Sequence, residues 1–337
     1  MSHIFVMGAG GFGTALSVMC ARFGHKVTLW SPFREEADAL GEKRENPRLL
    51  PGVVIDKRIE ITTGLEAVPS ADMLLLATPS GVVRATAQRI AGLVGRGVPV
   101  ACVSKGLEAG TFKTLSQVLE EELPHNHSVA LSGPSHAEEV ARGVATKVVA
   151  ASRSRDAAEQ VQDILMNETF RIYVGDDVLG VELGGAMKNV IALAAGVLDG
   201  LGGGDNTKAA LMTRGVAEIA RLGLALGAKS ETFAGLSGIG DLIVTCNSMH
   251  SRNRRFGMLI GQGVPVDEAL EQIGMTVEGY PCAKTGHELS QKHRIDMPIT
   301  AEVYNVLYEG KSPADVIKDL MERPRRHESE TIWLLSR

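Results

Sequence analysis

Lys188 is the side chain whose surroundings in this sequence are most unusual for its charge. Residues 178–198 are almost entirely apolar, and Glu182 is the only other charged residue among them. Burial in such a helix would disfavour the ammonium and lower the pKa of Lys188 toward that of a useful general acid or base. A lysine can also extend its charged end to water and keep its ordinary properties. Composition alone leaves both interpretations open.

A second lysine and an aspartate lie where a site on a parallel sheet would need them. Lys105 closely follows the apolar stretch 98–103, and ligands of such sheets bind beyond the carboxyl ends of the strands. Asp241 closes the glycine-rich turn SGIGD at 237–241. The alternatives are a solvated loop lysine and an aspartate that caps a helix. His136 has no carboxylate at an informative spacing and is a weaker catalytic candidate.

The segment SRNRRFG at 251–257 is typical of an anion site. Ser251 is a suitable N-cap, so backbone N–H groups at the start of the helix and the Arg252 guanidinium can converge on one phosphate or carboxylate. Arg254 and Arg255 are better explained as a charged helix start or as partners in salt bridges between domains. The sequence therefore predicts an anionic partner for Arg252.

The sequence GAGGFG, which begins at Gly8, matches the G-x-G-x-x-G fingerprint of dinucleotide-binding turns. It lies between an expected strand at residues 4–7 and an expected helix at residues 14–23, and this context gives an otherwise weak motif its meaning. Gly8 would permit the tight turn, Gly10 the close approach of a pyrophosphate, and Gly13 close packing of helix on strand. The alternative is a strand–helix turn without a ligand.

The end of the second expected strand, residues 27–30, bears on the choice between NAD and NADP. An NAD site usually places a carboxylate there to bind the ribose 2′-hydroxyl. The chain continues SPFR, without a carboxylate at the strand end, so Arg34 could face a 2′-phosphate. This predicts use of both NADP(H) and NAD(H), with NADPH preferred. The alternative is a surface arginine beside Glu35 and Glu36.

The pattern of apolar stretches predicts an α/β chain with two halves. Strands covered on both faces of a parallel sheet lack polar alternation, and such stretches lie at residues 4–7, 27–30, 73–77, 98–103, 128–131, 147–151 and 171–174. Later residues indicate helices only, at 181–198, 209–226, 251–262, 266–273, 283–292, 300–308 and 312–321.

We therefore predict a Rossmann-like NAD(P)-binding domain with a mostly parallel sheet over residues 1–177. An all-helical substrate domain is predicted over residues 178–337. The tail is expected to be a solvated end, because it carries Arg323, Arg325, Arg326 and His327.

Composition excludes several classes of protein. The 337 residues carry a net charge of −5 and 4% aromatic residues, so neither a basic field nor stacked rings are available for nucleic acid. No basic segment precedes the uncharged stretch 4–21, and its glycines interrupt it, so neither a signal peptide nor a membrane span is expected. The four cysteines are far apart and suggest no disulfide framework or zinc site. A cytoplasmic protein without a metal is predicted.

Taken in order, a set of segments resembles one family. They are GAGGFGTAL from Gly8, SKGLE from Ser104, GPS from Gly133, LGGAMKNV from Leu183, GIGDL from Gly238, SRNRRFG from Ser251 and VEGY from Val277. Together they closely resemble the bacterial-type NAD(P)-dependent glycerol-3-phosphate dehydrogenases, from residue 4 to about residue 308. The segments around Lys188 and Ser251 are far more specific than the glycine fingerprint. One departure is Ser31-Pro32, where family members often carry Gly-His or a similar polar pair.

The resemblance implies reversible, NAD(P)H-dependent reduction of dihydroxyacetone phosphate to sn-glycerol 3-phosphate, the backbone precursor of glycerophospholipids, by a homodimer. It implies Lys188 as proton donor or acceptor, with Lys105 and Asp241 beside it. Besides the fingerprint glycines and Arg34, the implied cofactor contacts are Gly11, Phe12, Lys105, Ala137, Arg252 and Glu278. The implied substrate contacts are Lys105, Gly133, Ser135, Lys188, Asn189, Asp241, Thr245, Ser251, Arg252 and Asn253.

Two other functions remain open from the residues alone. A reductase of the same architecture that acts on a 3-hydroxyacid or on ketopantoate would use the Arg252 cluster for a carboxylate. A non-catalytic protein that senses NADP would not need Lys188 or Asp241, and both are present.

Overall fold

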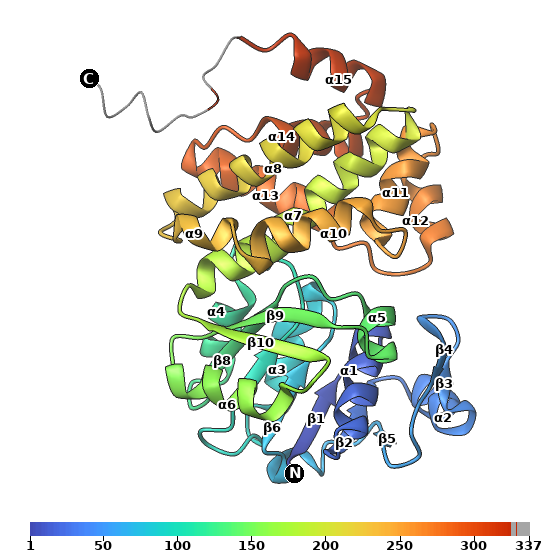
Figure 1. Ribbon diagram of the computed structural model, residues 1–337, viewed down its shortest axis with the longest axis vertical. Helices are drawn as coiled ribbons and strands as arrows, with labels where there is room; N and C mark the ends of the chain where they lie inside the picture. The colour runs from blue at the N-terminus through green and yellow to red at the C-terminus, as the bar shows by residue number, and fades with distance from the viewer. Residues whose placement is uncertain (325–327, 329–337) are drawn as a thin grey trace.

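The computed structural model describes residues 1–324 and residue 328. A sheet-based part and a helical part are stacked along the long axis of the molecule (Figure 1). Of the predicted solvated tail, Arg325, Arg326 and His327 lie outside the described residues. Arg323 is described and forms an ion pair with Asp296 at 3.0 Å, so this arginine is held by the helical part instead of being free in solvent.

One sheet of eight strands forms the centre of the N-terminal part. All neighbouring strands are parallel except β8 and β9, which are antiparallel. The predicted mostly parallel, Rossmann-like sheet is thereby confirmed. From one edge to the other the strands are β10 (Phe170–Gly175), β9 (Thr146–Ala151), β8 (Ser128–Ser132), β7 (Val100–Cys102), β6 (Met73–Leu76), β1 (His3–Met7), β2 (Lys26–Trp30) and β5 (Glu60–Thr62).

Both faces of this sheet are covered by helices, which explains the absence of polar alternation in the strands. Along β1, Ile4 and Val6 face one apolar core, and Phe5 and Met7 face the other. The first core contains residues of α1 (Gly11–Arg22), α5 (Ala137–Arg142) and α6 (Arg155–Leu165). The second contains residues of α3 (Val83–Ile90) and α4 (Leu115–Glu122). The carboxyl ends of the parallel strands are where ligands bind in sheets of this kind.

The seven predicted strands are present, with ends that differ by one or two residues from those expected. Three short strands were not predicted. β3 (Glu45–Asn46) and β4 (Leu50–Val54) form a separate antiparallel pair after α2 (Arg34–Lys43), and β5 is an edge strand. These segments are short and polar, and Pro51 and Gly52 interrupt β4, so they carry little apolar pattern.

The helical part is built around α7 (Val178–Gly200). This helix is long and apolar enough to cross a membrane, but 89% of its apolar window is buried inside the protein, so it is a core helix. The other helices are α8 (Asp205–Ala225), α9 (Ser230–Phe233), α10 (Asp241–Asn247), α11 (Arg252–Gly261), α12 (Val266–Ile273), α13 (Gly279–His293), α14 (Pro298–Tyr308) and α15 (Pro313–Met321). The part of the chain that the structure describes contains no strand after β10.

The predicted helices of this part are all present, and four of them, α7, α8, α13 and α14, begin two to four residues earlier than predicted. Helix α13 starts at Gly279, four residues before the expected start, and α8 starts at Asp205. The start of α13 was not predicted because Gly279 and Pro281 are usually unfavourable in helices. Proline is nevertheless accepted in the first turn of a helix, where its missing N–H is not needed. The short helices α9 and α10 were not predicted.

Glycines allow α11 to lie directly against α7. A Cβ atom at Gly196 would be 2.0 Å from the carbonyl oxygen of Arg254, and one at Gly257 would be 2.1 Å from that of Leu193. Only glycine permits two backbones to approach this closely. The start of α11, with its predicted anion site, is therefore fixed relative to the middle of α7, where Lys188 lies.

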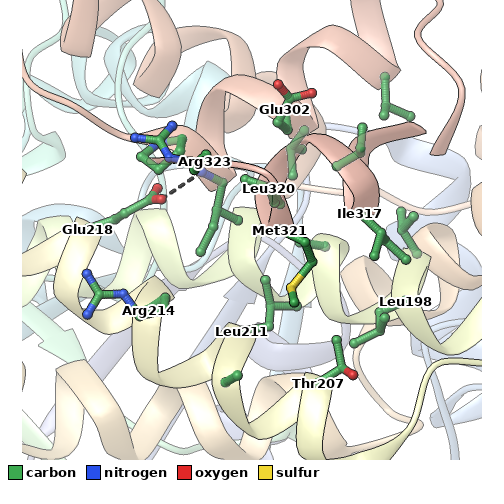
Figure 2. Close-up of a pocket in the computed structure, with 18 of the residues that line it drawn as sticks. Leu198, Thr207, Leu211, Arg214, Glu218, Glu302, Ile317, Leu320, Met321 and Arg323 are labelled. Carbon is green, nitrogen blue, oxygen red and sulfur yellow. Dashed lines mark hydrogen bonds between the residues drawn. The ribbon is translucent and has the colours of Figure 1, made fainter. Parts of the chain in front are cut away.

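A cavity of about 590 Å³ lies in the helical part between α15 and helices α7, α8 and α14. Figure 2 shows that Leu211, Ile317 and Met321 are among the apolar side chains around it. None of the predicted catalytic, cofactor-binding or substrate-binding residues lines this cavity. The candidate site is instead found where the two parts of the molecule meet.

Candidate active site

The glycine turn has the backbone geometry that a dinucleotide cradle requires. Gly8 has a φ of +114°, which side chains rarely tolerate, and a Cβ there would be 2.8 Å from the carbonyl oxygen of Ala77. A Cβ at Gly13 would collide with the backbone of Gly8 at 1.9 Å. A Cβ added at Gly10 would have no other atom within 4 Å, so this side of the turn is open and leaves room for a pyrophosphate.

The first turn of α1 adds an electropositive end to this cradle. Its N-cap is Gly10, whose lack of a side chain leaves the first N–H groups uncapped, and such groups bind phosphate together with the helix dipole. Gly11 and Phe12 belong to this turn, and a Cβ at Gly11 would be 2.5 Å from the carbonyl oxygen of Leu49. The residues present therefore fit the pyrophosphate of NAD(P).

Two lysines and one aspartate form the centre of the candidate site. Lys188 of α7 is 5% exposed and Asp241, the first residue of α10, is 1% exposed. The Lys188 ammonium donates hydrogen bonds to Asp241 Oδ1 and, at 2.7 Å, to Thr245 Oγ1. Lys105, from the loop after β7, donates to Asp241 Oδ2 at 2.7 Å and to the carbonyl of Gly133 at 2.9 Å. One carboxylate thus joins two ammonium groups from different parts of the molecule.

This arrangement resolves two of the alternatives. Lys188 does not extend to water; it is buried and paired. Asp241 does not cap a helix with its side chain; both of its oxygens accept from lysines. A buried carboxylate with two ammonium partners is stable only because every charge has an opposite neighbour.

Burial and neighbouring charges shift the ionisation of this cluster. Burial lowers the pKa of Lys188 to about 8, even though the adjacent Asp241 carboxylate raises it. Burial opposes ionisation of Asp241, but the charges of Lys105 and Lys188 outweigh it and hold the pKa of Asp241 below its usual range. A lysine with this pKa beside a fixed negative charge is suited to proton transfer near neutral pH.

The start of α11 has the N-cap that the sequence predicted for an anion site. Ser251 is the N-cap, and its side chain accepts a hydrogen bond from the N–H of Arg254 at 3.2 Å. Arg254 pairs with Asp199 of α7 at 2.7 Å, so it forms a salt bridge as expected, but within the helical part and not between domains. Arg252 is exposed and makes no hydrogen bond or ion pair within the described chain. Its guanidinium is thus available to an incoming phosphate.

Two asparagines connect this helix to the lysine cluster. Asn189 Nδ2 donates to the carbonyl of Lys105 at 3.2 Å, and Asn189 Oδ1 accepts from Asn253 Nδ2 at 2.9 Å. Asn253 in turn accepts from the N–H of Gly279 at 2.8 Å. Both asparagines are buried, so the start of α11 and the loop of Lys105 are tied through α7.

The loop after β8 closes another side of the cluster. Gly133 has a φ of +139°. Its carbonyl oxygen accepts hydrogen bonds from the Lys105 ammonium and, at 2.9 Å, from Ser135 Oγ. Ala137 begins α5 just beyond. His136 lies between them, and burial, followed by the charge of Lys188, lowers its pKa. No carboxylate accepts a hydrogen bond from His136 within the described chain.

Glu278 is held at the carboxyl end of the strands by Ser80, a residue for which the sequence predicted no role. Its carboxylate accepts from the backbone N–H of Ser80 at 2.9 Å and from Ser80 Oγ at 2.5 Å. Ser80 lies in the loop after β6, among the post-strand loops where sites of this fold class gather. That position was the available signal, but the partner of Ser80 lies 198 residues away along the chain.

The end of β2 differs from the prediction. Ser31 Oγ donates to a carboxylate oxygen of Glu36, so a carboxylate does lie at the strand end. The prediction was wrong because α2 begins at Arg34 and its first turn brings Glu36 back over Ser31. Arg34 is an exposed surface residue with a side chain 79% accessible, and it pairs with Asp38 one turn later at 3.2 Å.

Comparison with known proteins identifies the family. Residues 3–158 match the N-terminal model of NAD-dependent glycerol-3-phosphate dehydrogenase, and residues 177–318 match the C-terminal model. The chain belongs to the NAD-dependent glycerol-3-phosphate dehydrogenase family. Among the family's curated members, a glycerol-3-phosphate dehydrogenase [NAD(P)+] of Moorella thermoacetica is 55% identical over 97% of this chain and 98% of its own.

Two further relatives extend this result. A glycerol-3-phosphate dehydrogenase [NAD(P)+] of Desulfitobacterium hafniense is 51% identical over 100% of this chain and 96% of its own. The crystal structure of glycerol-3-phosphate dehydrogenase from Coxiella burnetii is 38% identical, with a TM-score of 0.92, and covers 96% of this chain and 99% of its own. The family suggested by the sequence motifs is confirmed over nearly the whole chain.

Proposed function

We propose that this protein reduces dihydroxyacetone phosphate to sn-glycerol 3-phosphate, reversibly, with NADPH or NADH, and so supplies the glycerophospholipid backbone. The observation that carries the proposal is the buried cluster of Lys188, Asp241 and Lys105. Hydrogen bonds through Asn189 and Asn253 connect it to the start of α11. A proton donor and a phosphate site are thus held in one rigid arrangement, which suits a phosphorylated ketone.

Each residue of the cluster has a separate task in the reaction. Bound NAD(P)H supplies a hydride to the carbonyl carbon. The Lys188 ammonium donates a proton to the carbonyl oxygen, and the Lys105 ammonium stabilises the negative charge that develops there. Asp241 orients both ammonium groups, and Thr245 accepts a hydrogen bond from Lys188. The products are the alcohol and NAD(P)+, after which Lys188 regains its proton from water.

Binding of the phosphate group fixes the position of the substrate relative to Lys188 and the cofactor. Arg252 and those first N–H groups of α11 that the Ser251 cap leaves unpaired bind the phosphate, with Ser251 and Asn253 at the same end. Gly133 and Ser135 border the reacting end. Binding energy gained at the phosphate positions the carbonyl carbon for transfer, although the phosphate itself does not react.

A reductase for carboxylate substrates is the competing function, and substrate choice separates the two. The absorbance of NADPH and NADH at 340 nm should fall when dihydroxyacetone phosphate is added to wild-type protein. Ketopantoate and 3-oxoacids should leave it unchanged. Oxidation of the cofactor by ketopantoate but not by dihydroxyacetone phosphate would defeat the proposal.

The pH dependence of the two directions should be opposite. Reduction needs the charged ammonium of Lys188, and the pKa of that group is about 8, so kcat for reduction should fall as pH rises through about 8. Oxidation of sn-glycerol 3-phosphate needs the neutral amine as base, so its kcat should rise over the same interval. Steady-state kinetics from pH 6 to 10 in both directions provide the measurement. Parallel profiles in the two directions would argue against Lys188 as the proton carrier.

Two charges of opposite sign bear on cofactor choice. Arg34 is exposed and its pair with Asp38 is of the weak surface kind, so it can turn to a 2′-phosphate. Glu36 keeps its charge while it accepts from Ser31, so it would weaken a preference for NADPH without removing it. We therefore propose use of both cofactors with NADPH preferred.

Substitution of these two charges should move the preference in opposite directions. Arg34→Ala should raise the KM for NADPH by about tenfold, the effect of one charge-assisted hydrogen bond, and leave that for NADH nearly unchanged. Glu36→Gln should lower the KM for NADPH. Initial rates with each cofactor measure both effects. If Arg34→Ala changes both KM values equally or neither, Arg34 is a plain surface residue.

We also propose that residues 1–177 bind the cofactor, that residues 178–337 carry most substrate contacts, and that the protein is a cytoplasmic homodimer. Support for a reducing compartment comes from the four cysteines, which are all buried and unpaired. The dimer follows from the family resemblance. Sedimentation equilibrium of the purified protein tests it, and a mass of 35.8 kDa in solution would exclude it.

A further inference from the structure

Asn189 occupies the position next to Lys188 on α7, yet it faces different partners. It is 5% exposed. Successive residues of an α-helix point about 100° apart. Lys188 therefore reaches Asp241 on α10, whereas Asn189 reaches the loop after β7 and helix α11.

The side-chain amide of Asn189 has no N–H left for a ligand. Its Nδ2 donates to the carbonyl of Lys105 at 3.2 Å and to that of Gly185 at 3.3 Å. An amide nitrogen carries two hydrogens, so both are used within the protein. The Oδ1 atom accepts from Asn253 Nδ2 at 2.9 Å. A contact between this amide and the substrate is therefore not needed to explain why an asparagine is buried here.

The partners leave only one direction for this chain of hydrogen bonds. The carbonyls of Lys105 and Gly185 can only accept, so Nδ2 of Asn189 must face them. At the other end the backbone N–H of Gly279 can only donate, and Asn253 Oδ1 accepts it at 2.8 Å. Asn253 Nδ2 must then face Asn189 Oδ1. Exchange of nitrogen and oxygen in either amide would leave buried groups unpaired.

This chain of hydrogen bonds joins the two ends of the candidate site. It begins at the backbone of Lys105 in the sheet-based part, passes through Asn253 of α11 beside Arg252, and ends at Gly279 of α13. The Lys105 ammonium is held independently, by Asp241 at 2.7 Å and by the carbonyl of Gly133 at 2.9 Å. Loss of the Asn189 amide would therefore release α11 from the loop while the ammonium keeps its partners.

We infer that Asn189 is a positioning residue that sets the distance between the phosphate site at the start of α11 and the loop that carries Lys105, whereas the glycine contacts between α7 and α11 already fix the distance to Lys188. It acts through Lys105 and Asn253, without touching the substrate. The inference rests on the proposed function, because it assumes a substrate with a phosphate at one end and a ketone at the other. A shift of about 1 Å between such sites costs as much as 10²-fold in rate.

The test compares dihydroxyacetone phosphate with unphosphorylated dihydroxyacetone in the wild-type protein and in the variants Asn189→Ala and Asn189→Asp. Dihydroxyacetone uses only the reacting end. The kcat/KM for dihydroxyacetone phosphate should fall about tenfold or more in both variants, whereas the slow turnover of dihydroxyacetone should fall less than about threefold. Asn189→Asp keeps the shape of the side chain and removes its two donors, so it reports on the hydrogen bonds should the alanine variant fold poorly.

A matched control distinguishes positioning from general loosening of the two parts. Glu182, also on α7, accepts a hydrogen bond from the N–H of Ser116 at 2.8 Å and so joins the two parts away from the site. Glu182→Ala should leave the ratio of the two kcat/KM values as in wild type. Equal losses for both substrates in the Asn189 variants, or no loss for either, would overturn the inference. Failure of the wild type to reduce dihydroxyacetone phosphate would instead overturn the proposed function.

Discussion

Lys188→Ala should lower kcat for reduction of dihydroxyacetone phosphate by about 10²–10⁴-fold, the usual cost of losing a general acid. The fold should persist, because Asp241 keeps its ion pair with Lys105 and no buried charge is left alone. Binding of NADPH, followed by fluorescence, should be close to that of wild type. The comparison of kcat with cofactor affinity therefore separates loss of chemistry from loss of structure.

Two controls sharpen this experiment. Lys208 also forms a buried ion pair, with Asp199 at 2.8 Å, but it has no contact with Asp241, so Lys208→Ala should retain most of the turnover. A small primary amine added to Lys188→Ala should restore part of the rate by entering the vacated space. Near-normal turnover in Lys188→Ala would remove this lysine from the mechanism.

Arg252→Ala should lower kcat/KM for dihydroxyacetone phosphate by about 10- to 150-fold, equivalent to ~1.5–3 kcal/mol for a hydrogen bond to a charged group. Arg252 lacks a hydrogen-bond or ion-pair partner within the described residues, so its removal leaves no buried charge unpaired. Most of the loss should appear as a higher KM for dihydroxyacetone phosphate. Initial-rate kinetics at saturating cofactor provide the measurement.

The neighbouring arginine provides the control for Arg252. Arg255→Ala removes the same charge from the same helix. If Arg252 acts by direct contact with the phosphate, and not by long-range attraction of the charged substrate, Arg255→Ala should lower kcat/KM for dihydroxyacetone phosphate less than about threefold. Added guanidinium ion should partly restore Arg252→Ala. Wild-type protein that used dihydroxyacetone as readily as its phosphate would show that no phosphate site exists at α11.

Local sequence patterns predicted the frame of the site well. The strand at β1, the turn from Gly8 and helix α1 are contiguous, so one segment carries the whole signal for a dinucleotide cradle. The apolar surroundings of Lys188 left burial and extension to water equally open, and the structure decides for burial, because α7 is a core helix on every side. The N-cap at Ser251 was also predictable, because capping depends on neighbouring residues.

Contacts between distant residues could not be predicted in the same way. Asp241 accepts from Lys188 and Lys105, which are 53 and 136 residues away along the chain, and only the folded chain brings them together. The pairing of Glu278 with Ser80 is invisible for the same reason. At the end of β2 the first turn of α2, not the strand itself, supplies the carboxylate of Glu36. The residues that directly follow β2 therefore gave no sign of this carboxylate.

The oxidation of the two enantiomers of glycerol phosphate by wild-type protein tests the central claim most directly. With NADP+ or NAD+ present at pH 9, where the neutral amine of Lys188 predominates, sn-glycerol 3-phosphate should produce absorbance at 340 nm. Its mirror image, sn-glycerol 1-phosphate, should not, because the phosphate site and Lys188 are fixed on rigid helices and accept one arrangement of the reacting carbon. Equal rates with both enantiomers, or no absorbance with either, would contradict the proposed function.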